Sequence, residues 1–243
     1  MNKKIEINLQ NKKRRIFKMQ LKMSCITCVF FLLLISSCKF NQNYFPYNEG
    51  KQIFYDVFFQ DKENTKQNFR QSFYFLPEND NSIPVLKNDG ELTFYENGDK
   101  GISKKNTKEF LSSNKDYKSQ LLLAFPIKEG VEWEVNDKTT IKMKLGYDRF
   151  YNTNLPFKLK NKIVSTNETI SIKGEKIKNC IKVSGYGKTS YYPDPTIGNI
   201  NIEIFSTTWF AKGLGMVKYT REEKSDSETM GKIIYEKTML IND

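Results

Sequence analysis

The sequence predicts an all-β protein, or nearly so, and three observations carry that prediction. Apolar and polar residues alternate in many short segments, which is the period of a half-buried strand. Turn sequences such as Asp89-Gly90 and Asn97-Gly98 separate these segments at short intervals. Helical periodicity is confined to residues 106–114, enough for one short helix. About eleven strands are expected, in a curved antiparallel meander that closes as a half-barrel or stacks as a sandwich.

The N-terminal 37 residues have the pattern of an export signal. The apolar segment 26–35 is too short for a membrane span, which needs about 20 residues, but it suits the apolar core of a signal peptide. It ends at Ile35-Ser-Ser-Cys38, which resembles a bacterial lipobox, an aliphatic residue and two small ones before the cysteine that is lipidated. We therefore expect a lipoprotein signal peptide at 1–37 and acyl chains such as palmitate on Cys38. An ordinary signal and an uncleaved anchor are the alternatives.

The start and destination of the chain follow from the same region. Met1, Met19 and Met23 can each serve as the start. Lys39, and not the aspartate associated with inner-membrane retention, follows Cys38, so we expect delivery to the cell envelope, at the outer membrane if the cell has two membranes. Residues 38–50 form an Asn-rich tether, and residues 51–243 form a single β domain.

Composition excludes several classes of function. Removing residues 1–37 takes away 8 of 39 basic and 1 of 28 acidic side chains, so the basic excess that would attract nucleic acid is largely lost with the signal. Histidine is absent, which excludes Ser-His-Asp and Cys-His catalysis and the usual zinc sites. Cys180 is the one cysteine after Cys38, and we expect it to be a buried free thiol. No metal, cofactor or nucleic-acid partner is expected.

The first part of the domain predicts a hairpin and shorter strands. Residues 51–60 and 68–76 alternate on either side of a polar turn. Residues 91–96 form a short strand between two turns, and 117–125 is a buried apolar run. Aromatic residues occupy both faces of the first hairpin, so these strands are either covered by protein or face a ligand groove. The residues concerned are Phe54, Phe58, Phe73, Tyr74 and Phe75.

The second part repeats the alternating pattern. Residues 131–135 and 141–145 predict a hairpin that turns at Asn136-Asp137, with glutamates opposite lysines on its polar face. Further strands are expected at 157–160, 170–172, 181–183, 200–204, 216–221 and 232–241.

Two motifs stand out from the pattern. Phe45-Pro-Tyr-Asn-Glu-Gly50 returns eighty residues later as Phe125-Pro-Ile-Lys-Glu-Gly130, which indicates the same Pro- and Gly-fixed turn leading into a strand twice. Residues 209–219, with Gly213 and Gly215 around Leu214, predict a tight corner between two strands. A phosphate cradle would require a helix after these glycines, and a strand pattern follows instead.

Three distinctive segments occur in order along the chain: Tyr44-Phe-Pro with Gly50, Lys178-Asn-Cys-Ile-Lys-Val183, and Trp209-Phe-Ala-Lys-Gly-Leu-Gly-Met-Val-Lys218. Together they resemble a family of bacterial envelope lipoproteins of unknown function, the TapB-like group. The chain departs from the family pattern at Phe54, where tryptophan is usual, and at Lys212, where proline is usual. The resemblance implies a curved antiparallel sheet, in the form of a half-barrel, and no established activity.

Function is expected to be binding and not catalysis. We expect a membrane-tethered β domain whose partner is an apolar ligand, a lipid or another envelope protein. Tyr191 and Tyr192, in a Pro-fixed aromatic loop, and Trp209 are the candidate contacts. A structural lipoprotein without a ligand is the second hypothesis. A carboxylate-dependent hydrolase is the third, and it would need acidic side chains to converge in a cavity.

Overall fold

The structure is a computed structural model that describes residues 43–61, 64–79, 82–107, 119–145, 149–193, 195, 198–227 and 232–240, with the side chains of 141–152 left undescribed. The chain divides into two compact units, Met1–Gln42 and Asn43–Asp243, and the described residues all belong to the second. The predicted signal peptide, Cys38 and most of the predicted helix at 106–114 lie outside the described residues. The described part is all-β, as predicted.

Twelve strands are described, close to the eleven expected. They are β1 (Gln52–Gln60), β2 (Lys66–Phe75), β3 (Ile83–Lys87), β4 (Leu92–Gly98), β5 (Gly101–Asn106), β6 (Gln120–Ala124), β7 (Glu132–Leu145), β8 (Arg149–Ile172), β9 (Glu175–Tyr191), β10 (Ile200–Ala211), β11 (Gly215–Ser225) and β12 (Lys232–Met239).

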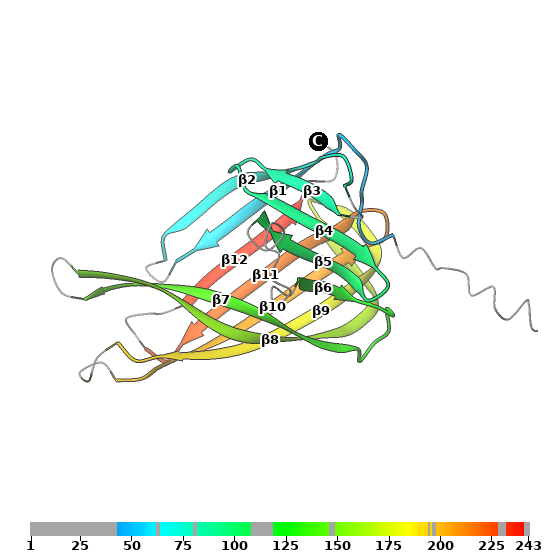
Figure 1. Cartoon of the computed structure of the whole chain (residues 1–243). Coiled ribbons are helices and arrows are strands. Elements are labelled where there is room, and N and C mark those ends of the chain that lie inside the picture. The colour runs from blue at the N-terminus through cyan, green and yellow to red at the C-terminus, as the bar shows by residue number, and fades with distance from the viewer. Residues whose placement is uncertain are drawn as a thin grey trace, which may run out of the picture. The chain divides into compact units, whose positions relative to one another are not determined.

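The strands form one antiparallel sheet that curves until its edges approach each other. The order across the sheet is β6-β5-β4-β3-β2-β1-β12-β11-β10-β9-β8-β7, so each half of the chain contributes a six-stranded meander (Figure 1). The edge strands β6 and β7 meet where Trp133 Nε1 donates a hydrogen bond to the Leu121 carbonyl oxygen at 3.0 Å. The domain is therefore a nearly closed, barrel-like sheet, the half-barrel alternative and not the sandwich.

The prediction of a hairpin that turns at Asn136-Asp137 is wrong. Residues 132–145 form one continuous 14-residue strand, β7, which pairs with β8 from Glu132 opposite Lys162 to Leu145 opposite Arg149. Asp137 lies within the strand because its carboxylate is bound by Arg221 from across the sheet, so this polar residue needs no turn to reach a partner.

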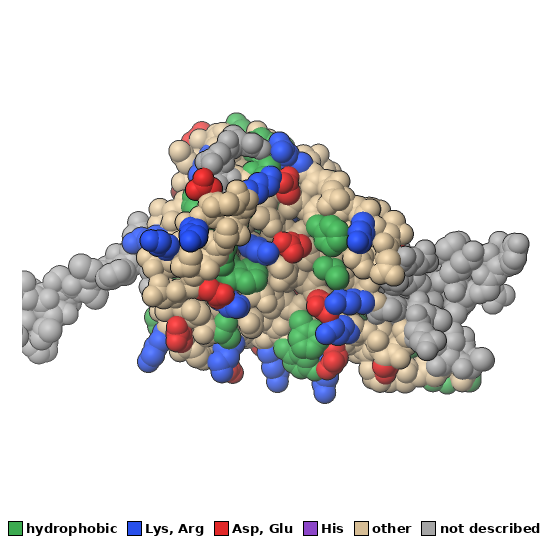
Figure 2. All heavy atoms as spheres, turned by 180° about the vertical axis from the view of Figure 1, so that it is seen from behind, with side chains coloured by type: hydrophobic (Ala, Val, Ile, Leu, Met, Phe, Trp, Pro, Cys, Tyr) green, Lys and Arg blue, Asp and Glu red, His purple; other side chains and the backbone are tan. Residues whose placement is uncertain are grey.

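The glutamates predicted to face lysines do so, but the lysines belong to β8. Glu132 pairs with Lys162 and Glu134 with Lys158, each at 2.8 Å. The segments 157–160 and 170–172, expected as separate strands, both lie in the 24-residue β8. Basic and acidic side chains are interspersed over the face seen from behind (Figure 2), as a solvated sheet face requires.

Each copy of the repeated Phe-Pro segment ends in a glycine turn before a strand, as predicted, although the Phe125-Pro126 peptide bond is cis and Phe45-Pro46 is not. Gly50 N–H donates to the Phe75 carbonyl oxygen at 2.9 Å, and Gly130 N–H donates to that of Ile163 at 2.8 Å. Both glycines have positive φ, +76° and +87°, which side chains other than glycine rarely adopt. The first turn leads into β1 and the second into β7.

Buried side chains gather in two hydrophobic clusters. The larger one joins β1–β6 to β8–β12 and includes Tyr55, Phe73, Val85, Ile102 and Leu123. The smaller one joins β7 and β8 to β10 through Val135, Phe157, Leu159, Ile200, Ile202 and Ile204. Every residue of both clusters lies between Phe45 and Leu240, so a chain that begins after Cys38 retains all of the described core. In the described part of the chain, no helix has the length and hydrophobicity that a membrane crossing requires.

Candidate ligand cavity inside the sheet

A cavity of about 370 Å³ lies within the curved sheet, between the two halves of the domain. Side chains from both meanders and from the segment before β1 line it. The aromatic ones are Tyr44, Phe45, Tyr55, Phe73, Phe75, Tyr95, Phe210, Tyr219 and Tyr235. Its volume is within the range of small-molecule sites, which begins at about 300 Å³. Its wall combines aromatic and aliphatic side chains with polar and charged ones.

The segment before β1 supplies part of the cavity wall. The ring of Phe45 stacks on Tyr95 at 5.1 Å between centroids and meets Phe75 edge-on at 5.6 Å. The Asn43 carbonyl oxygen accepts a hydrogen bond from Gly213 N–H at 2.6 Å. Residues 43–46 therefore cross the turn between β10 and β11 and bring Tyr44, Phe45 and Pro46 to the cavity; we call these four residues the plug.

The corner predicted at the two glycines is confirmed. Gly213 and Gly215 have φ values of +77° and +78°, and a Cβ on Gly215 would lie 2.5 Å from Pro46 Cδ. No side chain fits between this backbone and the plug. The Tyr44-Phe-Pro segment and the glycine corner are therefore in direct contact, although about 170 residues separate them along the chain.

Cys180 lies on β9, next to this contact. Its side chain is 0% exposed and its thiol is free, as the sequence predicted. Burial, and then the nearby Glu168, raise the pKa of the thiol. Burial and Cys180 in turn raise the pKa of Tyr44. Ile181 is paired with Phe210 of β10, so the three segments of the family resemblance meet at one end of the domain.

Lys237 of β12 is the most unusual residue of the cavity wall. Only 8% of it is exposed, and its ammonium lies 4.5 Å from the ring centroid of Phe73 and 5.1 Å from that of Tyr55. In the described part of the chain, no carboxylate forms an ion pair with it. Burial, together with the positive charges of Lys87 and Lys104, lowers its pKa to about 7.

Two further lysines face the same part of the cavity. Lys87, at the end of β3, lies 5.9 Å from the centroid of Phe73 and forms an ion pair with Glu91. Lys104 of β5 is paired with Tyr95 of β4 and lines the cavity. Counting Arg221, four basic side chains and one carboxylate, Asp137, line the described wall. The cavity is therefore electropositive as well as apolar.

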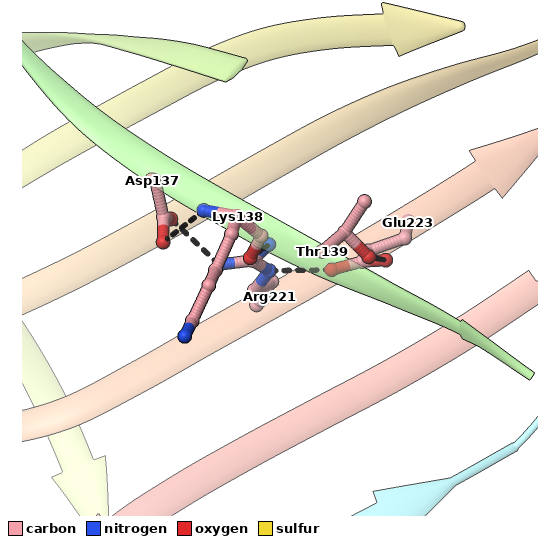
Figure 3. A network of polar contacts seen from close by, with 5 residues as sticks. All are labelled: Asp137, Lys138, Thr139, Arg221 and Glu223. Atoms are coloured by element: carbon pink, nitrogen blue, oxygen red, sulfur yellow. Dashed lines mark hydrogen bonds and ion pairs between the residues drawn. The ribbon is translucent and has the colours of Figure 1, made fainter. Parts of the chain in front are cut away.

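Unlike Lys237, Arg221 of β11 lies in a polar network in which each guanidinium nitrogen has a partner (Figure 3). Its Nη1 binds Asp137 Oδ2 and its Nε binds Glu223 Oε1, each at 2.7 Å, while Nη2 donates to the Lys138 carbonyl oxygen at 3.1 Å. Thr139 Oγ1 donates to the other oxygen of Glu223. Three strands separate β7 from β11 in the sheet order, so this network joins β7 to β11 across the interior.

Neighbouring groups keep Arg221 protonated. Burial opposes the charge, but Tyr219, Asp137 and Glu223 together raise the pKa of the guanidinium above its ordinary value. Burial raises the pKa of the adjacent Tyr219 as well, despite the opposing effect of Arg221. The guanidinium therefore keeps its charge and is bound to both carboxylates at 2.7 Å.

The structure does not bring the three predicted contact residues together. Tyr191 ends β9 and packs against the smaller cluster, and Tyr192, just beyond it, is 58% exposed. Trp209 faces outward on β10, its ring between Lys182 and Lys218 at 5.6 and 5.8 Å. Since Tyr191 is nine positions along β9 from the partner of Trp209, the two lie about 30 Å apart. The described cavity wall includes none of them.

The aromatic residues of the first hairpin divide between the two faces of the sheet. Phe73 and Phe75 are buried and line the cavity. Phe54 and Phe58 are half-buried on the opposite face, and Tyr74 is 41% exposed there. Of the five, Phe73 and Phe75 therefore line the cavity within the sheet, and Phe58 lines a separate, more open pocket with Phe69 and Lys173.

Sequence reasoning missed the lysines of the cavity. Tyr235, Lys237 and Met239 alternate with Glu236 and Thr238, and this alternation places Lys237 on the apolar face. A lysine on the buried face of a strand is the signal that could have found it. In the described part of the chain, no three acidic or cysteine side chains gather as a metal site would need.

Comparisons with known proteins find distant structural similarity only. No family model and no curated protein sequence matches the chain, so the TapB-like resemblance stays a prediction. The hypothetical lipoprotein YmcC from Escherichia coli is similar at 12% identity and a TM-score of 0.33, over 81% of this chain and 88% of its own. A candidate lipoprotein from Parabacteroides distasonis is similar at 12% identity and a TM-score of 0.38, over 82% and 97%. Likeness at these scores assigns no role to the chain.

Proposed function

We propose that this chain is a lipid-anchored envelope protein whose β domain binds an apolar or amphipathic molecule inside its curved sheet. The observation that carries the proposal is the cavity of about 370 Å³, with a wall built from the aromatic rings of both meanders. A sheet that buried only its own side chains would fill this space, because protein interiors are close-packed.

Anchoring rests on the sequence of residues 1–38. The cationic flank, the short apolar core and the Ile-Ser-Ser-Cys segment support lipidation of Cys38, and more than one acyl chain makes release from the membrane slow. Intact mass and detergent partitioning of the wild type and of Cys38→Ala test this part. An unlipidated wild-type protein in the aqueous phase would contradict it.

Binding is tested with a neutral hydrophobic dye and the chain that begins after Cys38. We expect the dye to bind the folded protein and Leu121→Trp to weaken that binding, because Leu121 lines the cavity. Leu86→Trp is the matched control, since Leu86 is an exposed leucine outside the described cavity wall. Dye that binds only on unfolding would favour the structural lipoprotein without a ligand.

A carboxylate-dependent hydrolase is the less favoured alternative. Asp137 does line the cavity, but the guanidinium of Arg221 binds both Asp137 and Glu223. A general acid or base must exchange its proton directly with the substrate, and here both carboxylates are occupied by the guanidinium at 2.7 Å. We therefore propose no catalytic role for either residue.

A further inference from the structure

Lys237 is a buried cation for which the described protein supplies no counter-ion. Buried lysines are almost always paired, because an isolated charge is costly to remove from water. The rings of Phe73 and Tyr55 give its ammonium some stabilisation through their π faces. Rings offer no hydrogen-bond acceptor comparable to an oxygen, so the three donors of the ammonium can still bind an anion.

Neighbouring groups add to the attraction for an anion at this point. The ring of Phe73 lies within reach of two ammoniums, at 4.5 Å from Lys237 and 5.9 Å from Lys87, so the two charges are close to each other. Lys104 faces the same cavity. Gln71 also lines it, and its Oε1 is buried without a hydrogen-bond partner in the described structure. Polar side chains of β2, β3, β5 and β12 therefore converge on this part of the cavity.

We propose that the cavity binds a single-chain amphiphile with an anionic head, a carboxylate or a phosphate, and that Lys237 binds that head with Lys87 and Lys104 beside it. This proposal rests on the proposed function and adds the chemistry of the ligand. An anion would complete the charge balance of Lys237, and an alkyl chain would lie against the rings of Phe45, Phe75 and Tyr95.

The volume of the cavity sets the size of the ligand. At roughly 30 Å³ for each water-sized group, a cavity of about 370 Å³ holds about twelve such groups, which corresponds to one alkyl chain of medium length. A lipid with two long chains is too large. Dodecanoate and dodecyl phosphate are therefore suitable probes, with dodecan-1-ol as the uncharged probe of the same length.

Binding of an anionic head should depend on pH. Lys237 titrates near pH 7 without ligand, so it is charged at pH 6 and neutral at pH 9. The charged and titratable groups that face it or act on it are Lys87, Lys104, Asp89, Glu91, Tyr55, Tyr235 and Tyr219, its cross-strand partner on β11. Asp89 and Glu91 oppose the effect of the two lysines. Anionic probes should therefore bind more tightly at pH 6 than at pH 9.

The experiment is titration calorimetry of the chain that begins after Cys38, with the three probes at both pH values. At pH 6 we expect dodecanoate and dodecyl phosphate to bind at least about ten-fold more tightly than dodecan-1-ol, the value of one charge-assisted hydrogen bond. Lys237→Met should abolish this preference and leave dodecan-1-ol unaffected. Lys182→Met is the matched control, a lysine over an aromatic ring that lies outside the described cavity wall.

Each outcome decides a different point. Equal binding of all three probes, unchanged by Lys237→Met, would overturn the anionic head while the proposed function stands. Failure of every probe to bind would overturn the proposed function itself. Inorganic phosphate that binds as tightly as dodecyl phosphate would show a site for free anions and would overturn the amphiphile.

Discussion

Two cations, the partly buried Arg221 and the buried Lys237, face the same cavity and differ in what surrounds them. Arg221 contacts two carboxylates and a carbonyl oxygen, whereas the ammonium of Lys237 lies over two aromatic rings and has no ion pair among the described residues. A cation whose partners are all supplied by the fold holds strands together. A cation whose partners are missing costs stability, and the fold would keep it where something else binds it. The first site is therefore structural, and the second is the candidate for function.

The largest effect should come from removing the paired cation. Arg221→Met leaves Asp137 and Glu223 buried without a counter-ion, and breaking such a pair typically costs about 3–5 kcal/mol of unfolding free energy. Urea denaturation measures the loss. Adding Asp137→Asn and Glu223→Gln to the same chain should recover part of it, since the uncompensated charges are then gone.

A suitable control for Arg221→Met is Arg70→Met, because Arg70 pairs with Asp56 while both side chains are about half exposed. Its effect should be far smaller. Equal losses in the two variants would show that the network across the interior has no special role.

Replacing Lys237, the unpaired cation, should change the unfolding free energy in the opposite direction and stabilise the protein. The pKa of Lys237 is about 7 in the folded protein against 10.5 for the free group, so between these pH values only the unfolded chain holds the proton. Stability should therefore rise as the pH rises from about 7 to 10.5 and fall as it drops toward 7. Lys237→Met should raise the unfolding free energy at pH 6, by a few kcal/mol, and change it little near pH 10.5.

Thermal or urea unfolding at the two pH values measures this difference, with Lys182→Met as the control that should show no such pH dependence. A Lys237→Met protein that is less stable than the wild type at pH 6 would contradict the description of Lys237 as an unpaired buried charge.

Much of the fold was predictable because alternating apolar and polar residues indicate a strand with one buried face. Ile200, Ile202 and Ile204 face the core as expected, and Gly213 and Gly215 form the predicted corner. The hairpin at Asn136-Asp137 failed because a polar pair inside a strand looks like a turn when its partner, Arg221, lies far along the chain. The cavity was unpredictable for a related reason. Lys87, Lys104 and Lys237 converge only through the closure of the sheet, which no local pattern records.

The plug gives a way to change the cavity near Lys237 without touching its charges. Gly215→Ala would place a Cβ at 2.5 Å from Pro46 Cδ and also strain a positive φ, at a cost of about 1–3 kcal/mol. Gly213→Ala is the matched control, because it has the same positive φ but nothing within 4 Å of its Cβ. We expect Gly215→Ala to lose more unfolding free energy and more dye binding. Equal losses in both variants would mean that the contact with Pro46 is unimportant.

The smallest expected effect concerns the rate at which a thiol reagent modifies Cys180. Cys180 is fully buried, with a thiol pKa raised by burial, so a thiol reagent should modify the native protein slowly. Gly215→Ala should speed the reaction, because Tyr44 of the plug lies near Cys180. Fast labelling of the folded wild type, or a dimer linked through Cys180, would contradict the buried position of this thiol.

The central claim is that the space within the sheet holds a ligand, and native mass spectrometry of the protein tests it most directly. The chain that begins after Cys38, expressed with a secretion signal and purified from the cell envelope without detergent, should retain a bound amphiphile of one alkyl chain with an acidic head. Lys237→Met should lose that extra mass, and Lys182→Met should keep it. A wild-type protein that carries no added mass, and gains none when incubated with dodecanoate at pH 6, would contradict the claim.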